Sequence, residues 1–279
     1  MSSNKKKIFS NIGLYVFVVA FVGAILLPFV WLVLGAFKNM RELFTMPLVM
    51  LPEKLRFDNF FKIFEMQPFA KYILNSLVIS LLATGFVIIV SSMASYSIAR
   101  VDIKGKKLVL AALLSVTLLP PVTLLNPIYQ MLGNLHLLNT HLGLALSIVA
   151  VELPMAVWFL SGFFQSIPLA MEESAMIDGA DMFTMFTRIL IPLIAPGIFT
   201  VSILVFINSW NNYLFAQVFN PLETARTVTV ALTLFQTEYY VPWELLSAAS
   251  VVVTAPLIIV VLLLQKKIIS GMMDGGVKG

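Results

Sequence analysis

The chain has 279 residues, of which 59% are hydrophobic and 11% are charged, and its formal net charge is +4. Ordinary soluble domains carry roughly 25% charged residues, so this composition excludes that class and indicates a protein embedded in a membrane. The absence of cysteine excludes disulfides and thiolate chemistry, and the small positive charge fits an anionic inner leaflet without requiring nucleic acid.

Long uncharged segments follow one another along the chain, and a helix needs about 20 apolar residues to cross a bilayer. Pro120-Pro121 and the polar stretch 133–141 divide the longest segment into two. The sequence therefore predicts an all-α integral membrane fold with six spans. Their expected ranges are 8–37, 72–99, 108–131, 142–164, 189–222 and 245–265.

The distribution of positive charge predicts the orientation. Eleven of the eighteen Lys and Arg residues lie before span one, between spans two and three, between spans four and five, or after span six. Because cytoplasmic loops carry an excess of Lys and Arg, we expect both termini in the cytoplasm and a multi-pass protein of a bacterial-type plasma (inner) membrane. The first external loop mixes acids and bases, which indicates a folded segment.

The segment 172–197, between spans four and five, concentrates charge, glycine and proline. Pro168 suits the first turn of a helix, Asp178-Gly179 suits its end, and Asp181 can cap a second short helix. We expect a helix, an elbow and a helix at the membrane surface, followed at Pro192 and Pro196 by span five. Its acidic and small residues are expected to be exposed: Glu172, Glu173, Ser174, Ala175 and Gly179.

Two interpretations of this segment remain open from its chemistry. An ordinary amphipathic loop on the lipid headgroups is one, but interfacial helices usually carry Lys and Arg on their polar face. This segment carries four acids and one arginine. A docking surface for a cytoplasmic protein explains the sign of the charge better.

The same residues carry a family resemblance. Glu173-Ser174-Ala175, then Asp178-Gly179-Ala180, and then Ile189-Leu190-Ile191-Pro192 after Arg188 resemble the EAA loop of ABC importer permeases. Ser174 stands where that pattern has its first alanine, and Ile191 where it has leucine. Further stretches are similar to the maltose-type carbohydrate permeases: Pro28-Phe29-Val30-Trp31, Phe57-Asp58-Asn59-Phe60, Asn75-Ser76-Leu77, Trp210-Asn211-Asn212-Tyr213 and Gly276-Val277-Lys278-Gly279.

The resemblance implies a type I (MetI-like) importer fold, with a coupling helix in the loop of about 165–191 that seats in a cleft of an ATPase subunit. It divides the chain into 1–70 (N-terminus, first span and external segment), 71–268 (transmembrane core) and 269–279 (cytoplasmic tail). It also implies a second related permease, two ATP-binding subunits, an extracytoplasmic solute-binding protein and a carbohydrate substrate. The implied coupling residues are Glu172, Glu173, Ser174, Ala175, Asp178, Gly179, Ala180 and Pro192.

The sequence contains no motif that indicates catalysis or nucleotide binding by this chain. A phosphate-binding loop G-x-x-x-x-G-K-[ST] is absent; the nearest approach, at 271–276, is followed by Val277. His136 and His141 are expected to be loop or interface residues, and neither a catalytic group nor a metal site is indicated. We expect no bound cofactor, and ATP with Mg²⁺ would be used by the partner ATPase.

Polar residues within the expected spans are candidates for a substrate pathway. Asn208, Asn211 and Asn212 have the spacing of one helical face, and Trp210 beside them could offer a flat surface to a sugar ring. Pore lining and hydrogen bonding between helices explain this spacing equally well. Further candidates are Thr123, Asn126 and Gln130 on span three and the intramembrane acid Glu152; Ser80, Thr84, Ser91 and Ser95 are expected to pack helices.

Two other functions are weighed against the importer. A secondary transporter driven by an ion gradient would predict inverted repeats with broken helices, and Glu152 would be its solitary coupling acid. An intramembrane enzyme would need convergent catalytic groups. The sequence favours the importer subunit over both.

Overall fold

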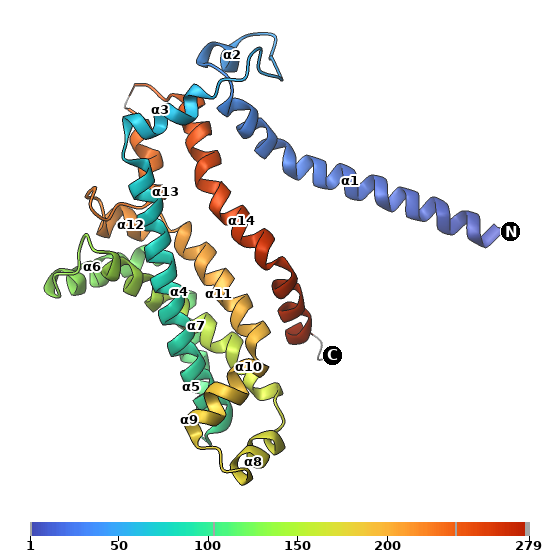
Figure 1. Ribbon diagram of the computed structural model, residues 1–279, viewed down its shortest axis with the longest axis vertical. Helices are drawn as coiled ribbons and strands as arrows, with labels where there is room; N and C mark the ends of the chain where they lie inside the picture. Colours follow the sequence, from blue (N-terminus) through green and yellow to red (C-terminus); the bar gives the residue numbers. More distant parts are fainter. Residues whose placement is uncertain (1, 103, 238, 277–279) are drawn as a thin grey trace. The chain divides into compact units, whose positions relative to one another are not determined.

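The computed structural model of the chain describes residues 2–102, 104–237 and 239–276, and the side chains within 13–263 of these (Figure 1). Helices, turns and irregular loops make up this described part, which contains no β-strand. The predicted all-α class is confirmed. Terminal positions used for the orientation and for the resemblance lie outside the described side chains: Lys5, Lys6, Lys7, Lys266, Lys267, Lys278 and the ending 276–279.

The chain divides into two compact units. The first comprises Met1–Pro68 and Leu232–Ala255, and the second comprises Phe69–Ala231 and Pro256–Gly279. The first unit contains α1 (Ser2–Ala36), α2 (Met40–Phe44), α3 (Asp58–Met66), η3 (Thr233–Phe235) and the beginning of α14 (Trp243–Gly276).

The segment between α1 and α3 is folded, as its mixed charge predicts. Lys38 is fully buried, with its Nζ over the ring of Trp31 and hydrogen-bonded to the carbonyl of Val49. Asn59 donates from Nδ2 to the carbonyls of Ala36 and Lys38, at 2.9 Å each. These bonds satisfy the backbone where α1 ends.

The second unit contains the remaining helices, and α13 ends one residue beyond it. Their bounds are α4 Phe69–Arg100, α5 Lys106–Thr117, η1 Pro121–Leu124, α6 Leu125–Asn134, α7 His141–Ser166, α8 Leu169–Ile177, α9 Met182–Thr184, the π-helix η2 Met185–Leu190, α10 Ile191–Leu193, α11 Ala195–Trp210, α12 Leu214–Phe219 and α13 Val228–Leu232.

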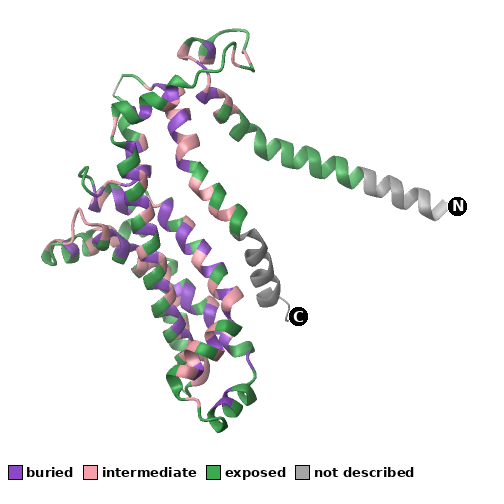
Figure 2. Ribbon diagram, viewed as in Figure 1, coloured by how far each residue is buried: buried purple, intermediate pink, exposed green. Residues whose placement is uncertain are grey.

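Helices α4, α7 and α11 pack against one another and form the core of this unit (Figure 2). The hydroxyl of Ser95 on α4 donates to the carbonyl of Val157 on α7 at 2.9 Å. Ser80, Ser91 and Ser95 are all buried, and small residues of this kind let helix backbones approach closely. The prediction that Ser80, Ser91 and Ser95 pack helices together is confirmed.

Within the described residues, four helices are long and apolar enough to cross a membrane unbroken: α4, α7, and the stretches Gly13–Ala36 and Trp243–Leu263 of α1 and α14. Two bent pairs bring the number to six if each is one span: Lys106–Thr117 with Pro121–Asn134, bent by 97°, and Met182–Leu193 with Ala195–Trp210, bent by 76°.

Two expected spans are therefore wrong as single helices. Span three was expected over 108–131, but Pro120 and Pro121 lack the N–H groups that would continue α5, and the chain turns there. Span five was expected over 189–222, but α11 ends at Trp210 and α12 begins at Leu214. The side of the membrane on which each loop lies stays a prediction.

The length of α4 fixes the distance between two polar clusters of the second unit. Asn75 lies near its beginning and Arg100 is its last residue. Twenty-five residues of continuous α-helix span about 37 Å at 1.5 Å per residue, against a hydrocarbon core of about 30 Å. The surroundings of Asn75 and Arg100 therefore lie at opposite faces of the membrane.

Two glycines of α7 provide a stability test. A Cβ on Gly143 would lie 2.1 Å from the main-chain oxygen of Leu137, whereas a Cβ on Gly162 would meet nothing within 4 Å. We expect Gly143→Ala to cost about 1–3 kcal/mol through overpacking, and Gly162→Ala to be neutral or to stabilise by up to about 1 kcal/mol.

Thermal unfolding of the two variants in the same detergent measures this difference. The close approach at Gly143 is refuted if both variants unfold at the wild-type temperature.

Candidate functional site

The helix α8 begins and ends where local chemistry predicts. Pro168 immediately precedes it. At the other end, Gly179 has a φ of +87°, the left-handed conformation that glycine adopts at helix C-termini. The N–H groups of Asp178, Gly179 and Ala180 donate back to the carbonyls of Ser174, Met176 and Ala175, at 2.9–3.1 Å. The predicted elbow at Asp178-Gly179 is confirmed.

The chain after the elbow also follows the prediction. The side chain of Asp181 accepts a hydrogen bond from the backbone N–H of Thr184 at 2.9 Å and caps α9. Hydrogen bonds from Thr184 hold the pKa of the Asp181 carboxyl below its ordinary value. The helical path continues through the π-helix η2, and Pro192 and Pro196 lie in the first turns of α10 and α11.

The two sides of α8 differ sharply in burial. Glu172, at 5% exposure, and Ala175 face the interior, while Glu173 and Ser174 are exposed. The expectation that Glu172 and Ala175 are exposed is therefore wrong. Residues three apart share one face of a helix with 3.6 residues per turn, so Glu172 and Ala175 lie together. Glu173 points away from that face.

Burial of Glu172 is made possible by a cation from another helix. The Nε of Arg100, the last residue of α4, forms an ion pair with Oε1 of Glu172. Arg100 also donates from Nη2 to the carbonyl of Ile167, at 2.9 Å, and the hydroxyl of Tyr96 donates to Oε2 of Glu172 at 3.3 Å. We call Arg100, Glu172 and Tyr96 the inner clamp.

The opposite side of α8 is apolar and exposed. Its side chains share one helical face with Glu173, and Ile177 is 86% exposed. We define the outer face of α8 as Leu169, Glu173, Met176 and Ile177. Beyond the elbow, Met182 and Phe183 are also exposed. Contiguous exposed apolar side chains mark binding surfaces in folded proteins.

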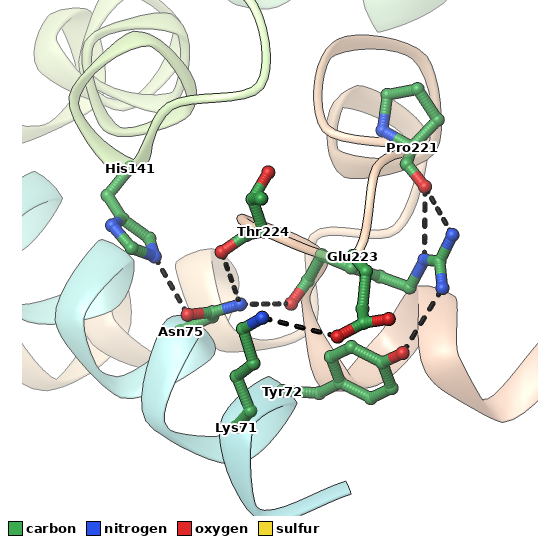
Figure 3. Close-up of polar contacts among 8 residues, drawn as sticks. Lys71, Tyr72, Asn75, His141, Pro221, Glu223 and Thr224 are labelled. Carbon is green, nitrogen blue, oxygen red and sulfur yellow. Dashed lines mark hydrogen bonds and ion pairs between the residues drawn. The ribbon is translucent and has the colours of Figure 1, made fainter. Parts of the chain in front are cut away.

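A second polar cluster surrounds Asn75 at the other end of α4 (Figure 3). Its Nδ2 donates to the carbonyls of Thr224 and Arg226, at 3.3 and 2.9 Å. Because Nδ2 is the donor, Oδ1 is free to accept from Nε2 of His141 at 2.8 Å. Ser76 accepts from the N–H of Val228 at 2.8 Å. These bonds fix the loop between α12 and α13.

Arg226 closes the same loop. Its guanidinium donates to the carbonyl of Pro221 and, at 3.2 Å, to the hydroxyl of Tyr72, while an exposed ion pair joins Lys71 to Glu223 (Figure 3). Sequence reasoning missed this cluster and the role of Arg100. The partners lie about 70 to 150 residues apart. The available signals were the stretch Asn75-Ser76-Leu77 and a lone cation, Arg226, between two apolar spans.

The predicted pathway residues are only partly brought together. Nδ2 of Asn208 donates to Oε2 of Glu152 at 3.2 Å, which joins α11 to α7. Asn208 is exposed and Glu152 is half-buried. On α6, Gln130 and Asn126 are exposed and hydrogen-bonded to each other at 3.3 Å. We call Asn208 and Glu152 the intramembrane pair.

The predicted shared face of three asparagines is wrong. The helix α11 ends at Trp210, so Asn211 is its C-cap and Asn212 lies beyond it, where its Oδ1 accepts from the N–H of Phe215. Trp210 is 1% exposed and stacks on Phe206, so it offers no surface to a sugar ring. On α7, the exposed Trp158 lines an apolar groove against α5.

No grouping of His, Asp and Glu that could hold a metal ion occurs among the described residues. His136 lies in the turn after α6 with a φ of 56°, and His141 belongs to the Asn75 cluster. The outer face of α8 can bind a protein surface. The intramembrane pair can accept hydrogen bonds from a polar solute or donate hydrogen bonds to it.

Residues 92–273 match the family described as binding-protein-dependent transport system inner membrane component. The chain belongs to this family. A sulfoquinovosyl glycerol transport system permease protein of Agrobacterium fabrum is 36% identical over 254 residues, covering 91% of this chain and 89% of that protein. A trehalose/maltose transport system permease protein of Thermococcus litoralis is 33% identical, covering 92% and 95%.

The permease fold is also that of a solved structure, a bacterial ABC transporter involved in the import of the acidic polysaccharide alginate. The TM-score is 0.79 at 20% identity, and the match covers 93% of this permease and 96% of that chain. The likeness confirms the predicted fold of ABC importer permeases.

The Asn75 cluster leads to a prediction for the permease. Asn75→Ala should leave two carbonyls and the Nε2 of His141 without their partner, at a cost of about 1–3 kcal/mol. Limited proteolysis of the loop 220–227 measures the effect, and cleavage should be faster than in the wild type.

Gln130→Ala is the matched control, because Gln130 is an exposed amide and surface substitutions usually change stability by less than about 0.5 kcal/mol. Equal cleavage rates for Asn75→Ala and the wild type would show that the cluster does not hold the loop.

Proposed function

We propose that the permease forms half of a carbohydrate pathway and is driven by ATP hydrolysis in a partner subunit that binds the outer face of α8. The observation that carries this proposal is the two-sided α8, which is buried and paired on one side and apolar and exposed on the other. The names of related permeases support a carbohydrate substrate, since they specify trehalose, maltose, sulfoquinovosyl glycerol and diacetylchitobiose.

The partners follow from the family and from the site. A solute-binding protein is supported by the family description and by an alginate transporter solved with its pentasaccharide-bound periplasmic protein. A second related permease would complete the pathway. Two ATP-binding subunits would use ATP with Mg²⁺, and this chain would bind no cofactor.

Positive charge near α8 supports a cytoplasmic location for this end of the permease. Arg100 ends α4, Lys104 lies in the turn that follows, Lys106 and Lys107 begin α5, and Arg188 lies after the elbow. Arg100 contacts α8 directly, so these cations lie on the same side of the membrane as the outer face of α8. Because cytoplasmic loops carry an excess of Lys and Arg, this charge supports an orientation in which the Asn75 cluster would lie outside and both termini in the cytoplasm, in a plasma membrane.

The coupling roles are divided by the two sides of α8. Glu173, Ser174 and the elbow residues Asp178, Gly179 and Ala180 would meet the ATPase, whereas Glu172 and Ala175 would support α8 from inside. Pro192 would act only by starting α10. Family membership leaves the ion-coupled alternative without a supporting observation.

The intramembrane pair would contribute to the pathway. A carboxyl and an amide facing lipid would be costly, so polar groups at this depth usually face a cavity or another helix. Asn208 is exposed on the permease alone, which supports contact with a water-filled pathway or with the second permease. Asn126 and Gln130 are exposed in the same way on α6.

Docking is tested by coexpressing the permease with its ATP-binding subunit and measuring copurification. Glu173→Lys should reverse the charge of the outer face, and Gly179→Pro cannot adopt a φ of +87°. Each should reduce ATPase binding by roughly 10-fold, which corresponds to about 1.4 kcal/mol.

Glu65→Lys on α3 is the control, since it makes the same charge change at an exposed position outside the predicted cytoplasmic region. Wild-type copurification of Glu173→Lys and Gly179→Pro would refute docking at α8.

The pathway role is tested by competition among maltose, trehalose and diacetylchitobiose for uptake. Asn208→Leu should change the relative preference for these sugars by roughly 3- to 10-fold, because a lost hydrogen bond contributes about 0.5–1.5 kcal/mol. Ser202→Ala on the same helix is the control, since the Ser202 hydroxyl bonds to the carbonyl of Ile198 within α11. If the Asn208→Leu variant is less stable but its preference among the sugars is unchanged, the intramembrane pair serves helix packing and does not contact the sugar.

A further inference from the structure

The helix α8 is too short to hold its own orientation. It has nine residues, and isolated helices shorter than about 12 residues are marginal in water. Its buried side presents Glu172 and Ala175. Ala175 packs in an apolar cluster with residues of η2, but alanine buries little surface, so the orientation of α8 depends largely on what holds Glu172.

The inner clamp joins three helices through one side chain. Arg100 ends α4 and reaches Glu172 in α8 through Nε, while its Nη2 reaches the carbonyl of Ile167, directly after α7. The planar guanidinium presents its donors in a fixed fork, which an ammonium group cannot reproduce. The fork therefore sets the distance and the rotation of α8 relative to α4 and α7.

Aromatic rings pack around Tyr96 of the inner clamp. The ring of Tyr96 meets those of Phe164 and Phe186 edge to face, with centroids 5.6 and 5.4 Å away, and Phe164 stacks on Phe186 at 6.1 Å. The side chains of Arg100 and Glu172 retain 10% and 7% exposure. Water is therefore largely kept from the charges, and a buried pair that loses one partner is strongly destabilised.

A buried ion pair is not needed for stability alone, because apolar residues of similar volume often stabilise a fold as well. Charges paired in one geometry do, however, favour one arrangement of the helices over others. We propose that the inner clamp makes α8 and the ends of α4 and α7 a single rigid body, so that a displacement of the outer face moves the membrane-spanning helices. Arg100, Glu172 and Tyr96 are positioning residues in this scheme.

The transmission role rests on the proposed function, but rigidity is testable on the permease alone. The sequence contains no cysteine, so Ile177→Cys on α8 and Met93→Cys on α4, both exposed, can carry two nitroxide labels. Pulsed electron paramagnetic resonance in lipid nanodiscs then measures the distribution of distances between the labels. A rigid α8 predicts a narrow distribution.

Glu172→Gln and Glu173→Gln make the same chemical change at neighbouring positions. Glu172→Gln should broaden the distribution about twofold, because Arg100 loses its charged partner, and Glu173→Gln should leave it unchanged. Arg100→Lys keeps both charges but loses the planar fork of the guanidinium, so it should also broaden the distribution. It replaces Glu172→Gln in the test if that variant fails to fold. Wild-type widths in Glu172→Gln and Arg100→Lys, or equal broadening in Glu173→Gln, would overturn the clamp.

Transmission is measured next, with the copurified ATPase. Glu172→Gln should retain ATPase binding, since the outer face is intact, and should lose most of the uptake per ATP hydrolysed. Glu173→Lys should instead weaken ATPase binding, so failure of docking and failure of the clamp give different results. A broadened distribution with unchanged uptake per ATP would overturn transmission through the clamp.

Discussion

The close packing of α4 against α7 is the constraint on which the second unit depends. Ser95 donates to the backbone of α7, and small buried side chains let two long helices lie against each other without lipid between them. Because α4 is continuous from Phe69 to Arg100, it holds the Asn75 cluster at one face of the membrane and the inner clamp at the other. Both clusters connect its ends to loops distant in sequence.

In the second unit, the charged residues are concentrated near these two ends of α4. Between them, the described side chains of α7 and α11 include one acid, Glu152, and it is paired with an amide. In α8, the buried acid Glu172, which is paired with Arg100, is followed directly by the exposed acid Glu173. Helical geometry separates them, so neighbouring glutamates support the helix and form its binding surface respectively.

Local chemistry predicted much of this architecture. The elbow at Gly179 and the cap at Asp181 depend on residues within a few positions, and both are confirmed. The burial of Glu172 could not be predicted, because its partner Arg100 lies 72 residues earlier. The end of α11 was missed because span length alone does not show that the helix stops at Trp210, or that the side chain of Asn212 accepts a hydrogen bond from Phe215 in α12. Hydropathy therefore located the spans, while long-range hydrogen bonds decided which polar residues meet.

The break between α5 and α6 restricts what can surround the third span. From Lys106 to Thr117, α5 rises about 18 Å, roughly half the thickness of a bilayer. Pro120 and Pro121 supply no N–H groups to the carbonyls before them, and Leu118 is 83% exposed. Irregular backbone at this depth is tolerated only against protein or water. Acyl chains are therefore excluded from this turn, which must border a hydrated lumen or another polypeptide.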